Sequence, residues 1–247
     1  MDITELPINS FDELIKELTE YNCGHFVYRG VSDKAHDLIP SIGRVSNDIL
    51  EFNQMSLKEY EEQTLKLFKL KSFSEYKGSN FNDLDWMVLA QHYGLPTRLL
   101  DWTTSPLVAL YFATKPIVSK SDYKIIKHEK DAAIYRYHCE NQLNSNDLVN
   151  PLTIKKHGIF FHKNITNRLS GQFGLFSIHQ NPKEPFNKNL KNYKCDCIHK
   201  IIIPKDIVRE VFEKIYALGV RHESIFPDLD GYSHDITTTL NLVQCHR

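Results

Sequence analysis

The sequence lacks the features that mark several large classes of protein. No apolar stretch approaches the roughly 20 residues that a membrane-spanning helix needs. The chain begins with an acidic segment, whereas a secretory signal begins with basic and then apolar residues. Its five cysteines are an odd number scattered through 247 residues, which is not the pattern of a disulfide framework. We therefore expect reduced thiols and a cytoplasmic protein without a membrane partner.

An excess of charge of one sign is also missing. The 30 Lys and Arg residues balance 31 Asp and Glu residues, so the formal net charge of −1 gives no general attraction to nucleic acid or anionic membranes. The net charge does not exclude a local basic groove that binds such a partner. The chain has no glycine-rich phosphate loop, no paired CxxC motifs and no GxSxG motif, which excludes P-loop nucleotide hydrolases, zinc ribbons and ordinary α/β-hydrolases.

Interleaved helix and strand patterns predict an α+β fold. With 41% hydrophobic residues the chain can bury a sizeable core. No domain boundary stands out, so we predict one domain of short mixed or antiparallel strands surrounded by helices. Strands are expected at 25–29, 132–138, 159–161, 175–179 and 198–203. Helices are expected at 11–21, within 46–76, at 206–218 and from 230 onward.

The run 91–113, QHYGLPTRLLDWTTSPLVALYFA, concentrates the most demanding chemistry of the chain. A helical pattern ends there, because Gly94 can take the left-handed closing conformation and Pro96 prevents continuation. A second helix is expected to begin at Thr104-Ser105-Pro106, where a hydroxyl can cap backbone N–H groups and the proline suits the first turn. We therefore expect a polar loop between two helices.

That loop, residues 97–103, presents four side chains of different chemistry. Arg98 is a fork-shaped donor, Asp101 a carboxylate, Trp102 an aromatic plane and Thr103 a hydroxyl, which together suit an anionic ligand that carries a ring. The structural alternative is an Arg98–Asp101 ion pair that fastens the loop, with Trp102 in the core.

Residues 25–29 are rich in β-formers and carry a second group of candidates. This strand would deliver Arg29 to its end beside Gly30, where a backbone can approach a ligand closely. The guanidinium can clamp a phosphate or ribose, and a surface ion pair is the alternative. Tyr28 can stack on a ring, and His92, at the expected helix end, can act as acid or base or be structural.

The last third of the chain offers further candidates. A second polar cluster consists of Arg168, Gln172, Gly174, Phe176 and His179. Glu223 is a candidate catalytic carboxylate if its segment is a strand that faces the pocket. Residues 226–231, FPDLDG, are typical of a tight turn, and magnesium held by the two carboxylates is the alternative.

The segment Cys195-Asp196-Cys197-Ile198-His199 resembles a metal-binding tract only superficially. Structural zinc usually needs a wider cysteine spacing and a second pair of ligands elsewhere. Strand alternation offers a simpler account, which places Cys195, Cys197 and His199 on the face that carries Ile201 and Ile203. No metal is therefore expected.

Four blocks of the sequence, in order, resemble the FRG domain family. They are Tyr28-Arg29-Gly30, then QHYGLPTRLLDWTTSP followed by ALYFA, then RLSGQFGLFSIH, and finally FPDLDG. The resemblance spans roughly residues 25–235. The family occurs mostly in bacteria and their mobile elements, and its name records a (Phe/Tyr)-Arg-Gly motif rather than a function.

A more distant similarity is to ADP-ribosyltransferases, in which an early strand ending in Arg-Gly precedes a hydroxyl-rich segment and a helix. The similarity implies that Arg29 holds NAD and that Thr103, Thr104 and Ser105 shape the nicotinamide pocket. By order, Glu223 matches the late glutamate that orients the ribose, although it lacks the usual Glu/Gln-x-Glu context. This resemblance implies NAD as the substrate.

The first functional hypothesis is therefore an ADP-ribosyltransferase-like protein or NAD glycohydrolase that acts as a bacterial toxin or antiphage effector. Arg29 and Arg98 would hold the pyrophosphate. The ring that stacks on nicotinamide or adenine would be Trp102, Tyr93 or Tyr28, and His92 or Glu223 would position the acceptor or water. A protein or nucleic acid would be the macromolecular acceptor.

Two other classes of function stay open at this point. A non-catalytic module would recognise a nucleotide or a partner protein through Arg29, Arg98 and Gln172. A magnesium-dependent nuclease would instead use Asp101, Asp228, Asp230 and His179.

Overall fold

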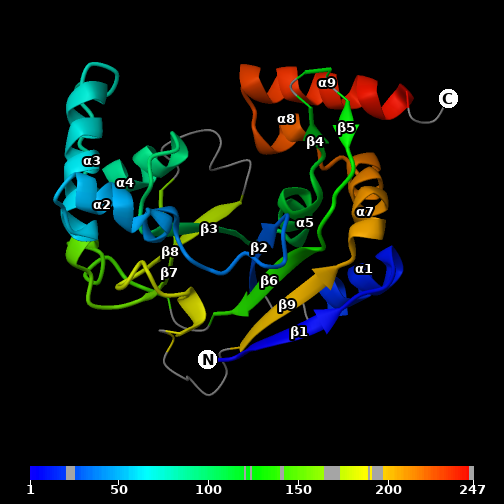
Figure 1. The fold of residues 1–247 in the computed structure, drawn as a ribbon, viewed down its shortest axis with the longest axis horizontal. Coiled ribbons are helices and arrows are strands. Elements are labelled where there is room, and N and C mark those ends of the chain that lie inside the picture. Colours follow the sequence, from blue (N-terminus) through cyan, green and yellow to red (C-terminus); the bar gives the residue numbers. More distant parts are fainter. Residues whose placement is uncertain are drawn as a thin grey trace.

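A mixed sheet of seven strands organises the protein (Figure 1). The computed structural model describes residues 1–20, 26–119, 121–122, 124–139, 142–163, 173–188, 190 and 197–244. In spatial order the strands are β1 (Ile3–Pro7), β9 (Cys197–Ile203), β6 (Ala132–His138), β2 (Phe26–Val31), β3 (Leu99–Thr103), β8 (Gly174–Ile178) and β7 (Gly158–Phe160). β1 runs parallel to β9, and the other neighbours are antiparallel. A separate hairpin joins β4 (Ile117–Val118) and β5 (Ile125–Ile126).

Eight α-helices surround this sheet in the described part of the chain. They are α1 (Phe11–Glu20), α2 (Asn47–Phe52), α3 (Leu57–Ser72), α4 (Asp83–His92), α5 (Pro106–Thr114), α7 (Lys205–Ala217), α8 (His222–Ile225) and α9 (Leu229–Gln244). The α+β prediction is confirmed, and so are the expected helices. Among the described helices, none is both long and apolar enough to cross a membrane.

Local signals set the two helix boundaries that matter for the site. Gly94 follows α4 with φ +84°, the left-handed conformation that ends a helix. The Ser105 hydroxyl accepts a hydrogen bond from the Val108 backbone N–H at 3.4 Å, and Pro106 occupies the first turn of α5. The segment between α4 and α5 therefore runs from Gly94 to Ser105.

That segment is not the polar loop that we expected, because its second half is strand β3. Leu99 to Thr103 pairs with β8, and Thr103 also pairs with Tyr28 of β2. A loop was expected because residues 97–103 lie between two helix signals, whereas the strands that pair with this segment lie far away in the sequence. Tertiary pairing thus decides the conformation of this segment.

Helix α5 lies directly on β2, and Gly30 makes this approach possible. A Cβ atom added at Gly30 would lie 1.9 Å from the Ala109 carbonyl oxygen. The glycine therefore serves helix packing at this contact, and not only the close approach of a ligand. Arg29 does not end its strand either, because β2 continues to Val31, which pairs with Ala133 of β6.

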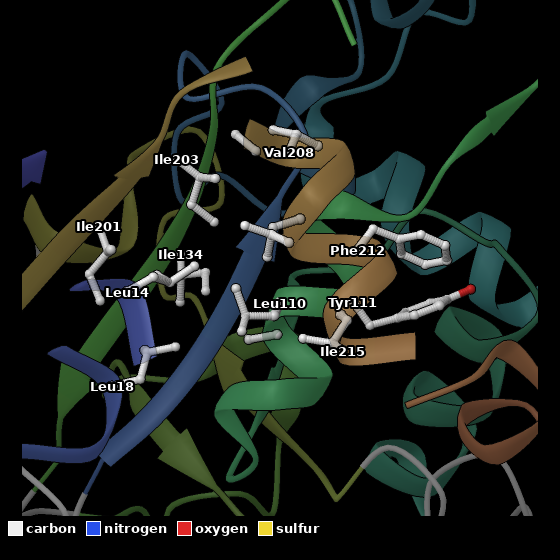
Figure 2. Close-up of a cluster of buried hydrophobic side chains, with 14 of the residues drawn as sticks. Leu14, Leu18, Leu110, Tyr111, Ile134, Ile201, Ile203, Val208, Phe212 and Ile215 are labelled. Carbon is white, nitrogen blue, oxygen red and sulfur yellow. The ribbon is translucent and has the colours of Figure 1, made fainter. Parts of the chain in front are cut away.

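One hydrophobic cluster fills the space between the sheet and three helices. Figure 2 shows its side chains from α1, α5 and α7 pointing toward those of β6 and β9. Helix α5 is apolar nearly all round, which is the composition of a helix buried between layers. Its fully buried side chains include Leu110 and Tyr111. The core therefore fixes α5, and with it the cavity described next.

The other hydrophobic clusters lie on the opposite face and at the far end of the sheet. Trp102 packs with Leu100, Tyr135 and Tyr137 in a second cluster. A third cluster joins α3 and α4 to β3 and β8. The two helices therefore pack against β3 and β8 through buried apolar side chains.

Candidate functional site

A cavity of about 270 Å³ opens where β2, β3, β8, α4 and α5 meet. Its lining residues come from segments that lie far apart in the sequence. They are Tyr28, Arg29, Gly30, Val88, Gln91, His92, Asp101, Trp102, Thr103, Phe112, Phe176 and Phe226. The structure thus gathers the Arg29 strand and parts of the 91–103 segment around one space.

Arg29 supplies the positive charge of the cavity wall. Its Nη1 donates a hydrogen bond to the Asp101 backbone oxygen at 2.6 Å and lies 3.9 Å from Asp101 Oδ2. The side chain is 21% exposed. Burial lowers the pKa of this guanidinium and the Asp101 carboxylate opposes the shift, so Arg29 stays charged. A charged group that is already partly dehydrated is well suited to bind an anion.

Gln91 holds Asp101 in place and was not among the predicted site residues. Its Nε2 donates to Asp101 Oδ2 at 3.1 Å and to the Leu99 backbone oxygen at 3.3 Å. Its Oε1 accepts a hydrogen bond from the Thr97 hydroxyl. The amide therefore fixes the orientation of a carboxylate that is 58% exposed. Its place in the last turn of α4, just before the polar segment, was the available sequence signal.

Aromatic rings form the apolar wall. Phe112 of α5 and Phe226 lie edge to face, with ring centroids 6.0 Å apart. Phe176 of β8 and the buried Tyr28 complete this wall. Of these rings only Tyr28 was predicted as a site residue. In the sequence, the other three cannot be distinguished from ordinary core residues; they are Phe112, Phe176 and Phe226. Planar surfaces of this kind suit a ligand with a ring.

Trp102 borders the cavity but is anchored in the core. The side chain is 2% exposed, and its Nε1 donates to the Ser177 hydroxyl at 3.0 Å. The ring also packs against Phe186, with centroids 5.7 Å apart. The structural alternative considered for Trp102 is therefore correct for most of its ring.

Arg98 lies outside the cavity and pairs with Glu61 of α3, not with Asp101. Its Nη2 lies 2.6 Å from Glu61 Oε2, and its Nε donates to both carboxylate oxygens. Both residues are buried, at 4% and 2% exposure. The Arg98–Asp101 pair considered as the structural alternative is thus not formed, because Asp101 turns toward Arg29 and Gln91 while Arg98 turns toward α3. This guanidinium is not available to a ligand in the cavity.

Only Thr103 of the hydroxyl-rich segment lines the cavity in the described structure. It is 4% exposed, and its hydroxyl accepts a hydrogen bond from the Ser105 backbone N–H at 3.0 Å. Thr104 is exposed, and the Ser105 side chain caps α5. The Ser105 hydroxyl therefore caps α5, whereas Thr103 forms part of the cavity wall.

His92 and Glu223 occupy different surroundings. His92 is the half-buried last residue of α4 and lines the cavity. Glu223 is exposed on α8, so the condition that its segment be a strand facing the pocket is not met. Among the described residues, Asp101 is the carboxylate that lines the cavity. The candidate Gln172 lies outside the described residues, as does Arg168.

The residues considered for metal binding are not gathered together. Within the described ranges, no group of three or more His, Cys, Asp and Glu side chains is placed to hold a metal ion. Asp228 instead accepts a hydrogen bond from the Gly231 backbone N–H at 2.9 Å in the turn that begins α9. His179 is fully buried, and burial lowers its pKa well below the usual value.

The alternation predicted for β9 is confirmed where it can be followed. Ile201 and Ile203 belong to the first hydrophobic cluster, whereas Ile198 belongs to the second, so Cys197 and His199 share the face of Ile201 and Ile203. Cys195 lies outside the described residues.

Comparison with known families identifies one domain. Residues 24–122 match the FRG domain, so the chain carries an FRG domain over that range. This range includes β2, α4, β3 and α5, which supply most of the cavity wall. No curated protein and no solved structure matches the chain significantly, so the similarity to ADP-ribosyltransferases gains no support there.

Proposed function

We propose that this FRG-domain protein binds NAD in the cavity and breaks the bond between nicotinamide and ribose, as an ADP-ribosyltransferase or an NAD glycohydrolase. The observation that carries the proposal is the convergence of Arg29, Asp101 and His92 on a space with an aromatic wall. A guanidinium binds phosphate, aromatic rings stack on nicotinamide or adenine, and a carboxylate attracts positive charge.

The chemistry requires a negative group beside the ribose. When the bond from ribose C1′ to the nicotinamide nitrogen breaks, the bonding electrons leave with nicotinamide, which departs as a neutral molecule. Positive charge then develops on the ribose, and Asp101, held by Gln91, would stabilise it. Water or a macromolecular nucleophile adds to C1′, and its proton passes to His92 or to solvent. Asp101 takes the part that the resemblance gave to Glu223.

Two matched carboxylate variants test this assignment. Purified protein is incubated with NAD, with and without cell lysate as acceptor source, and released nicotinamide is measured by chromatography. Asp101→Asn should reduce release by roughly 100-fold to 1000-fold, the usual effect of removing one stabilising group. Glu223→Gln should leave release unchanged. Loss in Glu223→Gln with full activity in Asp101→Asn would contradict the assignment.

The fate of ADP-ribose separates the two activities. Label from NAD that becomes attached to a lysate component indicates a transferase, whereas free ADP-ribose indicates a glycohydrolase. Either activity would suit a toxin or an antiphage effector, because consumption of NAD or modification of an essential molecule stops growth. Expression of wild-type protein should then slow growth, and Asp101→Asn should remove the effect.

A non-catalytic nucleotide-binding module is the second candidate. The exposed position of Glu223 favours it, since the late glutamate expected from the resemblance does not reach the cavity. NAD that binds without nicotinamide release, in the presence and absence of lysate, would support this candidate over the first.

A further inference from the structure

A second groove lies directly behind the wall of the cavity. It has a volume of about 200 Å³ and shares Arg29, Gln91 and Asp101 with the first space. Its remaining wall comes from the 3-10 helix η1 (Ser41–Arg44), the turn after α4 and the start of β3. The cavity and the groove therefore adjoin each other at these three side chains.

Two arginines face this groove. Arg44 is exposed on η1, and its Nη1 donates to the Ile39 backbone oxygen at 3.1 Å, which uses one of several N–H donors of the guanidinium. Its charge is close enough to Arg29 to contribute to the lowered pKa of that residue, after the larger effects of burial and Asp101. With Asp101 as the carboxylate between them, the two cations leave the groove wall with a net positive charge.

The backbone that carries Arg44 is fastened to the start of β3. The Ile42 N–H donates to the Thr97 backbone oxygen at 3.2 Å, and the Thr97 N–H donates to the Ser41 hydroxyl at 3.1 Å. On the other side η1 lies against a distant loop, since a Cβ atom added at Gly43 would lie 1.8 Å from the Pro182 carbonyl oxygen. Arg44 thus projects from a firmly held segment, and its distance from Arg29 is set by the fold.

We propose that this groove binds the phosphate groups of a dinucleotide whose ring occupies the cavity, with Arg44 as its second phosphate-binding residue. The inference rests on the proposed function and adds to it the surface that holds the diphosphate, including Arg44, which does not line the cavity. The size of the cavity supports this, because about 270 Å³ lies below the usual range of roughly 300–1,000 Å³ for ligand pockets. A dinucleotide must therefore extend beyond the cavity, and the groove provides the adjoining positive surface.

The test compares ligands with and without phosphate. Isothermal titration calorimetry on the full chain measures the Kd of NAD and of nicotinamide riboside, which has the same ring and ribose but no phosphate. Arg44→Gln should raise the Kd of NAD about tenfold or more and leave that of the riboside unchanged, because a charge-assisted contact is lost only with the first ligand. The difference should shrink as salt is added.

Two further variants complete the design. The control Arg209→Gln removes the same charge from α7. No described residue of α7 lines the cavity or the groove, so this variant should bind NAD like wild type. Arg44→Lys keeps the charge but not the fork and should fall between wild type and Arg44→Gln. Thermal unfolding of each variant shows that the fold is kept.

The outcomes separate the two proposals. If Arg44→Gln binds NAD like wild type, the phosphate groove is refuted while the NAD cavity stands. The groove is also refuted if Arg44→Gln weakens both ligands equally, or if wild type binds the riboside as tightly as NAD. If wild type binds neither ligand, the proposed function fails and the inference fails with it.

Discussion

Replacing Arg98 with methionine separates the structural role of this residue from the ligand-binding role predicted for it. In the structure the guanidinium and the Glu61 carboxylate are both buried, with Arg98 Nη2 and Glu61 Oε2 2.6 Å apart. Methionine would leave that carboxylate without its partner in the protein interior. Removing one member of a buried pair typically costs about 3–5 kcal/mol of unfolding free energy. This is a large share of the roughly 5–15 kcal/mol that stabilises a folded protein.

Urea unfolding and thermal melting measure this loss. For a chain of this length the melting temperature should fall by roughly 6–20 °C. The double variant Arg98→Met/Glu61→Met should be more stable than Arg98→Met alone, because it leaves no unpaired charge. NAD affinity of the folded variant should equal that of wild type. The reasoning is refuted if Arg98→Met keeps wild-type stability and loses NAD binding.

Three further predictions concern the framework around the site. Gly30→Ala should lower the unfolding free energy by about 1–3 kcal/mol in urea titrations, because the alanine Cβ would meet the Ala109 carbonyl oxygen. Wild-type stability would contradict the close packing of α5 on β2 at this position. Trp102→Phe should cost about 1–3 kcal/mol by the same assay, because it leaves the buried Ser177 hydroxyl without its donor, and wild-type stability would argue against this bond. Burial lowers the pKa of His157 to about 4, below its unfolded value of about 6.5. The stability contributed by the neutral ring should therefore be lost as pH falls from about 6.5 to 4. An equal loss in His157→Gln would show that another group is responsible.

The helices and several strands were predictable because their signals are local. A capping hydroxyl at Ser105, a proline after it and a closing glycine at Gly94 act within a few residues of the boundary that they set. Strand β3 was missed because its identity depends on pairing with β2 and β8. Those partners are selected by the whole sheet, so residues 97–103 alone could not indicate them.

Some residues of the candidate site could likewise be predicted from the sequence, whereas the roles of others depend on distant partners. Arg29, Asp101 and Thr103 were predicted, and the antiparallel neighbours β2 and β3 bring them together. Arg98 has the same chemistry in the sequence, but its partner Glu61 lies 37 residues away on α3, so no local pattern could show that the charge is already used. The aromatic wall was missed for a related reason. A phenylalanine beside a cavity and one in a core look alike until the surrounding elements are in place.

The decisive experiment asks whether the cavity lined by Arg29 binds and cleaves NAD. It measures nicotinamide release by chromatography, and NAD binding in parallel, for wild-type protein and for Arg29→Ala. We expect release by wild type, with both binding and release reduced in Arg29→Ala, because this guanidinium lines both spaces that the ligand would occupy. If Arg29→Ala binds NAD as tightly as wild type and releases nicotinamide as fast, the cavity between β2, β3 and α4 is not the NAD site.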